Sequence, residues 1–597
     1  MNPSVVNVSK RHPRHAAKGP ATRGFATDSW LVIGVLLAVS LGLQSIIFAP
    51  ISVWPCAYVC LVPWILVIGW CSSPRRVYVT SYLLGFAFFL INVKWIAPIT
   101  VAGYVALSAY LAAYFPLVAC PIRHAVRRRR VPMTIAVPVI WVGSEFLRAI
   151  VISGFPWFFL SHSQYRILPL IQISDLVGAY GVSFMVAMVN GALADAVFTW
   201  LRARTDRDGV TWWRRAWPGL AATAVVVLGV LVYGLVQIHR DTSVRGPKIA
   251  VIQGDYPSRI TGPIVTENEK ARRYFSIAEE AAATQPDLFL LPETPWTMFL
   301  NRSYRQLDDE TDQWVRWSKS CFEALQDFAT RHDAELITGA MSRVFTPLDR
   351  RAEEWKYNSA FVFRPDGSQP ERYDKVHTVY FGETVPFRFG RLRFLYIWFN
   401  SLSPFGQDDS EYTLTPGKEF NVFEMGAKSQ NGKRYRFGIP ICYEDVMPYV
   451  SRRFVIGPDG NKQVDFLLNI SNDGWFLHSN ELPQHLAICS FRAVENRVGI
   501  ARAVNTGISG FIDADGRIHD LVTGPDGRSH GPGIEGWRTA TIDVDTRCSL
   551  YSRTGDVFAL ICCLLWGAGY ADYLVARVRG NRAAEPKTTD RTHGLRP

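Results

Sequence analysis

The sequence lacks the residue spacings that would indicate a metal site or a set of disulfides. It has ten cysteines. The only closely spaced ones, Cys56–Cys60 and Cys562–Cys563, have no histidine or cysteine partners at the spacing of a zinc site. Most of the ten lie in apolar runs, where cysteine behaves as a small hydrophobic residue. We therefore expect neither a disulfide framework nor bound zinc.

Charged residues are also scarce, at 19% of the chain, whereas 48% of the residues are hydrophobic. The net charge of +12 could suggest a nucleic-acid-binding protein, but the basic clusters flank long apolar runs, and no nucleic-acid module is recognisable. Nucleic acid is therefore not an expected partner. No small-residue cleavage site follows the first apolar run, so residues 1–29 are interpreted as a cytoplasmic tail and not as a signal peptide.

Long apolar runs are what the sequence has in abundance, and each is near the ~20 residues that span a bilayer as a helix. Seven precede residue 240, and an eighth lies near the C-terminus. They are Trp30–Phe48, Val53–Cys71, Val77–Trp95, Ile99–Ile122, Val131–Ile150, Gln172–Phe198, Ala216–Gln237 and Val557–Val578. The runs predict a polytopic α-helical membrane domain with eight transmembrane helices, seven in residues 30–237 and one in 557–578. The alternative, buried helices of a soluble protein, does not account for so many runs.

Basic residues alternate between the loops and so predict the orientation of the chain. The loops on one side hold Arg75 and Arg76, then Arg127 to Arg130, then Arg202 to Arg215, whereas the opposite loops hold little more than Lys94 and Arg166. Cytoplasmic loops carry the excess of lysine and arginine. Both termini, including a second tail at residues 579–597, are therefore expected in the cytoplasm. The region between the seventh and eighth spans is expected outside it.

That region, residues 248–545, alternates strand-like and helix-like segments, which is typical of an α/β domain. The expected strands are Lys248–Gln253, Asp287–Leu291, Glu335–Gly339, Tyr357–Phe363, Tyr435–Pro440, Asp465–Ile470 and Gly499–Ala503. The expected helices are Thr266–Ala283 and Trp314–His332. Asp366–Gly367 and Asp515–Gly516 predict hairpin turns.

Three short segments of this domain carry reactive side chains next to predicted strands. Glu293 follows a hydrophobic strand in LLPETPW, and Lys375 precedes Glu383 in YDKVHTVYFGETVPF. Cys442 stands at a strand-to-helix junction in GIPICYEDVMP, where a sharp turn can expose a nucleophile. Taken alone, each has an ordinary explanation: a helix-start glutamate, a surface lysine and an inert buried cysteine. Their order and spacing favour a shared site.

The order and spacing of these residues resemble the Glu–Lys–Cys triad of the nitrilase, or carbon–nitrogen hydrolase, superfamily. The segments LNISNDGWF and RAVENRVGIARAVNTGISGFI, after the cysteine, are also similar to that family. The resemblance implies an α/β nitrilase-like αββα sandwich inserted between the seventh and eighth spans. It implies that Cys442 is the nucleophile, Glu293 the base and later the acid, and Lys375 the donor that stabilises the oxyanion.

The membrane half also resembles a known family. GFPW at Gly154–Trp157, Glu145 and Arg148 before it, and GAYGVSF at Gly178–Phe184 with Asn190 are similar to the apolipoprotein N-acyltransferases of the bacterial inner membrane. This resemblance implies transfer of an acyl chain from a phospholipid, through a cysteine thioester, to the α-amino group of a diacylated apolipoprotein. A monomer is expected in the inner membrane, with its catalytic domain on the periplasmic side and without metal or organic cofactor. The expected supporting or substrate-binding residues are Glu383, Tyr443, Glu444, Asn358 and Trp157.

The sequence departs from the family pattern at three positions, and two alternative functions remain open. Thr378, Tyr380 and Thr384 differ from the residues that the family commonly has around the lysine, so the preferred shape of the substrate is open. A membrane-anchored amidase would use the same triad and pass the acyl group to water. A non-catalytic lipid-binding or scaffolding protein is the other alternative, and the intact triad argues against it.

Overall fold

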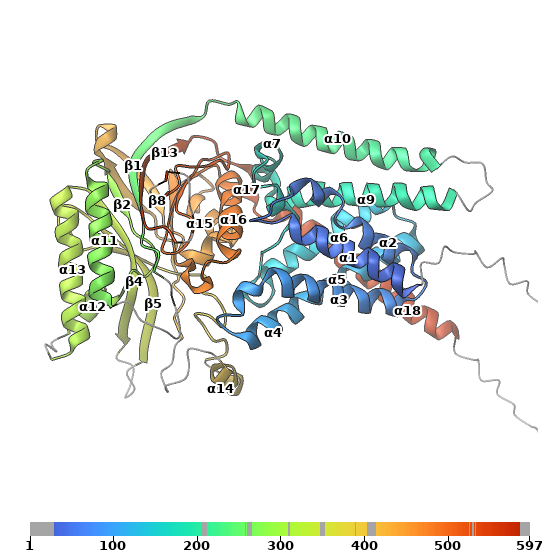
Figure 1. The fold of residues 1–597 in the computed structure, drawn as a ribbon, viewed down its shortest axis with the longest axis horizontal. Coiled ribbons are helices and arrows are strands. Elements are labelled where there is room, and N and C mark those ends of the chain that lie inside the picture. Colours follow the sequence, from blue (N-terminus) through green and yellow to red (C-terminus); the bar gives the residue numbers. More distant parts are fainter. Residues whose placement is uncertain are drawn as a thin grey trace, which may run out of the picture.

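The computed structural model has a helical part and an α/β part, which lie side by side along the long axis of the molecule (Figure 1). It describes residues 29–584 apart from 204–211, 257, 259–265, 308–310, 347–352, 389, 403–412, 525, 528–530 and 532. The predicted N-terminal tail and the end of the predicted C-terminal tail therefore lie outside the described residues.

The helical part consists of apolar helices from both ends of the described chain. The main ones are α1 (Trp30–Ile46), α2 (Val62–Trp70), α3 (Pro74–Asn92), α4 (Val101–Ala112), α5 (Tyr114–His124), α6 (Met133–Ile150), α9 (Ala179–Ala203), α10 (Trp212–Ile238) and α18 (Val557–Ala584). In the described residues, five continuous helical segments are long and apolar enough to cross a membrane: Val101–Arg129, Met133–Ser153, Ala179–Ala203, Trp212–Ile238 and Val557–Arg579. Leucine and valine side chains point outward from α10 and α18, as lipid-facing residues do.

The predicted sixth span, Gln172–Phe198, is wrong at its start. Its first residues follow the short helix α7 (Leu168–Ile171) and include a second short helix, α8 (Ser174–Val177), and the long helix α9 begins only at Ala179. Gly178 separates α8 from α9 with a φ of +71°, a left-handed conformation that glycine adopts without strain. Asp175 and Gln172, in this broken stretch, bind a buried arginine of the α/β part instead of continuing a helix.

The α/β part contains two mixed sheets. The first has the strand order β13-β1-β2-β4-β5-β6, with β3 beside β4, and the second has the order β12-β11-β10-β9-β8-β7. The strands of the first are β1 (Ser243–Gln253), β2 (Leu288–Leu290), β3 (Trp296–Phe299), β4 (Glu335–Thr346), β5 (Glu353–Phe363), β6 (Glu371–Asp374) and β13 (Gly536–Asp545). Those of the second are β7 (Phe423–Ala427), β8 (Lys433–Gly438), β9 (Phe466–Ser471), β10 (Gly499–Val504), β11 (Gly510–Ile512) and β12 (Ile518–His519). The predicted turns at Asp366–Gly367 and Asp515–Gly516 connect β5 to β6 and β11 to β12.

Successive side chains of a strand point to opposite faces of its sheet, and each face packs against a different layer. On β1, Ile249 and Val251 pack in the core between the sheets, whereas Ala250 and Ile252 pack with the helices outside the first sheet. Those helices are α11 (Glu267–Ala282) and α13 (Gln313–His332), and α15 (Pro448–Val455) and α16 (Glu481–Asn496) pack on the second sheet. The result is a helix–sheet–sheet–helix sandwich (Figure 1).

Helix α16 lies between the sandwich and the helical part. Leu486 and Cys489 join the hydrophobic core of the α/β part, whereas Ile488 and Phe491 join the core of the membrane helices. Every residue of α16 except the half-buried Pro483 is buried. The helix is therefore shared by the two parts.

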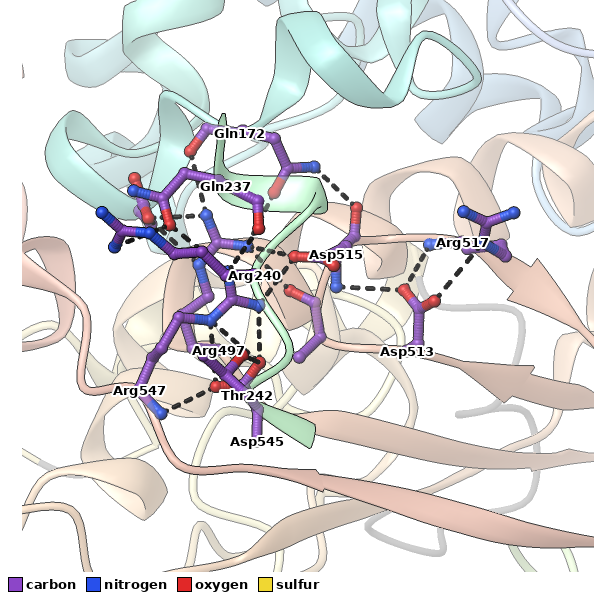
Figure 2. A network of polar contacts seen from close by, with 12 residues as sticks. Gln172, Gln237, Arg240, Thr242, Arg497, Asp513, Asp515, Arg517, Asp545 and Arg547 are labelled. Atoms are coloured by element: carbon purple, nitrogen blue, oxygen red, sulfur yellow. Dashed lines mark hydrogen bonds and ion pairs between the residues drawn. The ribbon is translucent and has the colours of Figure 1, made fainter. Parts of the chain in front are cut away.

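A polar network at the end of α16 also joins the two parts (Figure 2). Arg497 is fully buried; its Nη2 binds Asp175 Oδ2 at 2.6 Å, and its Nη1 binds Gln172 Oε1 at 2.6 Å. Nη1 also binds Asp515 Oδ1 at 2.7 Å, and Arg547 binds Asp515 at 2.8 Å. A buried arginine is stable only with such a set of acceptors, so the network fixes the α/β part against α7 and α8.

Candidate active site

The three predicted reactive side chains come from three separate strand ends and meet in the core of the α/β part. Glu293 follows β2, Lys375 follows β6, and Cys442 begins a 3-10 turn, Cys442–Asp445, after β8. Lys375 Nζ lies 3.3 Å from Glu293 Oε1, and the Cys442 thiol is near enough to both that, after burial, their charges are the main influences on its pKa. The structure therefore brings all three together.

Cys442 has a left-handed backbone, with a φ of +52°. A non-glycine residue in this region is strained, and such strain is common where a turn presents a side chain to a substrate. Burial raises the pKa of the thiol well above its ordinary value, the charge of Glu293 raises it further, and Lys375 opposes the rise. The resting cysteine is thus a neutral thiol that needs a base.

Glu293 is the base within reach of that thiol. Burial raises the pKa of Glu293, Lys375 lowers it, and Glu383 raises it. Asn358 donates a hydrogen bond of 2.6 Å to Glu293 Oε1. A buried carboxylate with a pKa raised toward neutrality is suited to accept and return a proton.

Lys375 stays an ammonium ion. Burial alone would lower its pKa, but the charges of Glu293, Glu383 and Cys442 outweigh this effect and hold the pKa well above its ordinary value. Glu383 Oε1 lies 2.8 Å from Nζ and also accepts a hydrogen bond from Asn358 at 3.2 Å. The lysine is therefore a fixed positive charge beside the thiol.

Glu444 positions the backbone on both sides of the site. Its Oε1 accepts from the N–H groups of Val376 and His377, directly after Lys375, at 2.8 and 2.9 Å. Its Oε2 accepts from Ile441 N–H, directly before Cys442, at 2.8 Å. Burial raises the pKa of Glu444 to about 7, although these donors lower it. One carboxylate thus connects the lysine segment to the cysteine turn.

Tyr443 and Trp157 connect the site to the helical part. The Tyr443 hydroxyl donates to Gly154 O at 3.1 Å, and its ring stacks on Trp157 with centroids 6.4 Å apart. The Trp157 indole donates to Gln484 Oε1 on α16 at 2.9 Å. The loop after α6 therefore forms one wall of the site.

The departures from the family pattern lie at the rim of the site. Thr378 is buried, whereas Tyr380 is 41% exposed and pairs with Thr384 in an isolated β-bridge. The Thr384 hydroxyl donates to Leu414 O at 3.0 Å. None of the three makes a hydrogen bond to the triad among the described contacts.

A buried ionic cluster that was not predicted from the sequence lies behind the cysteine turn. His485 Nε2 lies 2.7 Å from Asp445 Oδ1, and His485 Nδ1 lies 3.1 Å from Asp473 Oδ1. Arg502 binds the other oxygens of both aspartates. Glu481 completes the group, 3.4 Å from His485 Nδ1, and we call these five residues the His485 cluster. The aspartates follow β8 and β9 at the same sheet edge, which was the available sequence signal.

Asp473, Glu481 and His485 also present ligand atoms within 4.8 Å of one another, as a metal site does. Arg502, however, places its guanidinium against the oxygens of Asp473 and Asp445. A fixed cation already binds one oxygen of each aspartate, so the geometry does not favour a metal ion there.

The arrangement as a whole is suited to acyl transfer. A neutral thiol, a carboxylate that can take its proton and a fixed ammonium are the three groups needed to attack a carbonyl carbon and stabilise the resulting oxyanion. Asn358, Glu383 and Glu444 hold these groups, and Tyr443 and Trp157 line the side toward the membrane helices.

Comparisons with known proteins agree on both parts of the chain. Residues 40–192 match the model of the apolipoprotein N-acyltransferase N-terminal domain, and residues 248–545 match that of the carbon–nitrogen hydrolases. An apolipoprotein N-acyltransferase of Geobacter metallireducens is 30% identical over 546 residues, which cover 89% of this chain and 91% of that protein. One of Bordetella bronchiseptica is 28% identical over 618 residues, covering 96% and 100%. A solved Nesterenkonia amidase of the nitrilase superfamily has 16% identity and a TM-score of 0.33, covering 52% of this chain and 96% of that one.

Proposed function

The chain belongs to the apolipoprotein N-acyltransferase family, and from this premise we propose that Cys442, Glu293 and Lys375 carry out acyl transfer from a phospholipid to a lipoprotein. The convergence of Glu293 and Lys375, whose Oε1 and Nζ lie 3.3 Å apart, with Cys442 at the start of its strained turn is the observation that carries the proposal. The membrane-enzyme character follows from the family and from the apolar helices.

In the first half-reaction, Glu293 takes the thiol proton, and the Cys442 sulfur attacks the ester carbonyl carbon of the phospholipid. Lys375 Nζ and the backbone N–H after Cys442 stabilise the oxyanion, and each good donor in such a site contributes about 3–4 kcal/mol. The ester C–O bond then breaks, and Glu293 returns its proton to the departing oxygen. A lysophospholipid leaves, and the acyl chain remains on Cys442 as a thioester.

In the second half-reaction, the free α-amino group of the diacylglyceryl-modified N-terminal cysteine attacks the thioester. Glu293 accepts a proton from the attacking nitrogen, the C–S bond breaks, and the thiolate is reprotonated. The product is an amide. Asn358, Glu383, Glu444 and Tyr443 act in both halves by holding the triad and its entrance, and Trp157 forms the wall toward the lipid.

The membrane arrangement is also a proposal. We place eight spans in residues 30–237 and 557–578, the catalytic domain of residues 248–545 on the periplasmic side of the inner membrane, and both tails in the cytoplasm. The distribution of arginines in the loops supports this orientation. A monomer is sufficient, because the triad and its supporting residues all come from one chain.

The test is mass spectrometry of a lipoprotein N-terminus with and without this enzyme. We expect an added mass of one acyl chain, in amide linkage, only when the enzyme is present. The amidase alternative predicts free fatty acid and an unmodified N-terminus, and that result would refute the transfer to lipoprotein.

A further inference from the structure

The His485 cluster has no part in the mechanism described so far, although it adjoins the cysteine turn. Asp445 closes the 3-10 turn that begins at Cys442, and it is bound by both His485 and Arg502. On the other side, Ser471 links the cluster to the base: its hydroxyl donates to Asp473, and its carbonyl accepts the Glu293 N–H at 3.4 Å. The cluster therefore contacts the backbone that carries both the nucleophile and the base.

The geometry determines the protonation of His485. Its ring nitrogens face carboxylate oxygens on opposite sides, Asp445 at 2.7 Å and Asp473 at 3.1 Å. A neutral imidazole has only one N–H, so one contact would set a lone pair against a carboxylate. Both aspartates are held as anions, because Arg502 binds the second oxygen of each. His485 must therefore donate from both nitrogens, as the imidazolium ion.

The electrostatics of the surrounding groups agree with this geometry. Burial would lower the pKa of His485, but Asp445 and Asp473 outweigh that effect and raise it to about 10, with Arg502 opposing. Burial, followed by the charge of Asp473, raises the pKa of Glu481 well above its usual range and so favours the uncharged form of this fifth member. Two cations then face two anions, and the cluster has no net charge.

A neutral cluster matters to Cys442, because Asp473 is close enough to raise the pKa of its thiol. His485 also touches the membrane loop: its ring lies 5.7 Å from that of Trp157, and the neighbouring Gln484 binds the indole N–H. We infer that His485 is a positioning residue, and this inference rests on the proposed role of Cys442. His485 holds the cysteine turn through Asp445 and balances the negative charges of Asp445 and Asp473. It also connects the cysteine turn to the loop that contains Trp157.

The inference is tested in the full-length protein by removing the charge of His485 and then removing one opposite charge to restore neutrality. His485→Gln leaves one net negative charge behind Cys442, whereas His485→Gln with Asp473→Asn restores neutrality. Acyl-enzyme on Cys442 is measured by mass spectrometry after mixing with phosphatidylethanolamine in detergent micelles. We expect His485→Gln to form it about tenfold more slowly, as one unit of thiol pKa implies, with KM unchanged. We expect the double variant to recover part of the rate.

His519→Gln is the matched control, since His519 forms a half-exposed pair with Asp520 at 3.0 Å on β12. The single variant Asp473→Asn gives a second measurement, which does not depend on the folding of the histidine variant. It leaves a net positive charge, so Cys442 should react faster with iodoacetamide at neutral pH than in the unaltered protein. A normal rate in His485→Gln, or equal alkylation in Asp473→Asn, would overturn the inference. An unaltered protein without any adduct on Cys442 would instead refute the proposed nucleophile.

Discussion

Replacing Glu293 by glutamine tests the assignment of the base. The amide keeps the size of the side chain but cannot accept the thiol proton. An ordinary thiol, with a pKa near ~8.5, is only about 3% thiolate at pH 7. Burial, the largest cause of the raised pKa of Cys442, remains in the variant, although one neighbouring negative charge is lost. We therefore expect formation of the acyl-enzyme to fall by about 10²–10⁴-fold, the usual contribution of a general base.

The assay is trapping of the acyl-enzyme by intact-protein mass spectrometry with phospholipid alone, over a time course. Glu383→Gln is the informative comparison, because Glu383 lies closer to Lys375 Nζ, at 2.8 Å, than Glu293 does at 3.3 Å. It loses a partner of the lysine but keeps the base, so we expect a slow or partial adduct. Glu279→Gln, at an exposed pair with Arg331, should behave as the unaltered protein. A full adduct at normal speed in Glu293→Gln would show that another group activates the thiol.

Four further predictions follow from the same structure. Cys442→Ala and Cys442→Ser should abolish acyl transfer while leaving the protein folded in the membrane, and substantial activity in the purified alanine variant would end the proposal. A topology reporter fused near Gly432 should be active outside the cytoplasm, and activity only inside would refute the orientation. The folded-state pKa of His485 is raised to about 10 from an ordinary value of 6.5, so its stabilisation is complete below pH 6.5 and is lost as the pH rises toward 10. The melting temperature should therefore fall over this window more steeply than in His485→Gln, and equal slopes would contradict the imidazolium. Arg497→Gln should cost about 3–5 kcal/mol by leaving Asp175 and Asp515 without their cation, measurable as a lower melting temperature, and an unchanged one would show that the network in Figure 2 is not stabilising.

The convergence of Glu293, Lys375 and Cys442 could be predicted because their order and spacing resemble those of the carbon–nitrogen hydrolases. The strand before Glu293 is a short buried apolar run in the first sheet, whereas the strand before Cys442 is partly exposed and lies in the second, so local sequence alone does not bring the two together. The start of the sixth span was predicted wrongly, because its conformation depends on residues that are distant in the sequence. The segment Gln172–Val177 adjoins an apolar run, but the left-handed Gly178 separates it from α9, and its Asp175 binds the distant Arg497.

Helix α16 and the His485 cluster could not be predicted in the same way. A helix buried on all sides has no polar face, and its sequence, ELPQHLAICSFRAVEN, gives no clear helical period. The charges of the cluster cancel only in three dimensions, because Asp445, Asp473, His485 and Arg502 come from four different elements. Local sequence shows each charge without its partner.

The loop after α6, which contains Trp157, is held in its conformation by contacts with the α/β part. Ile152, Ser153 and Phe158 all have left-handed backbones, with φ of +52°, +68° and +57°. Such conformations cost on the order of 1–3 kcal/mol each and persist only where the surroundings impose them. The α/β part supplies that constraint, because Tyr443 donates to Gly154 O and the His377 ring lies 3.4 Å from the Ser153 hydroxyl. The strained loop in turn positions Trp157 against Tyr443, next to the nucleophile. The side of the candidate site that Trp157 and Tyr443 line is therefore formed by contacts between the two parts.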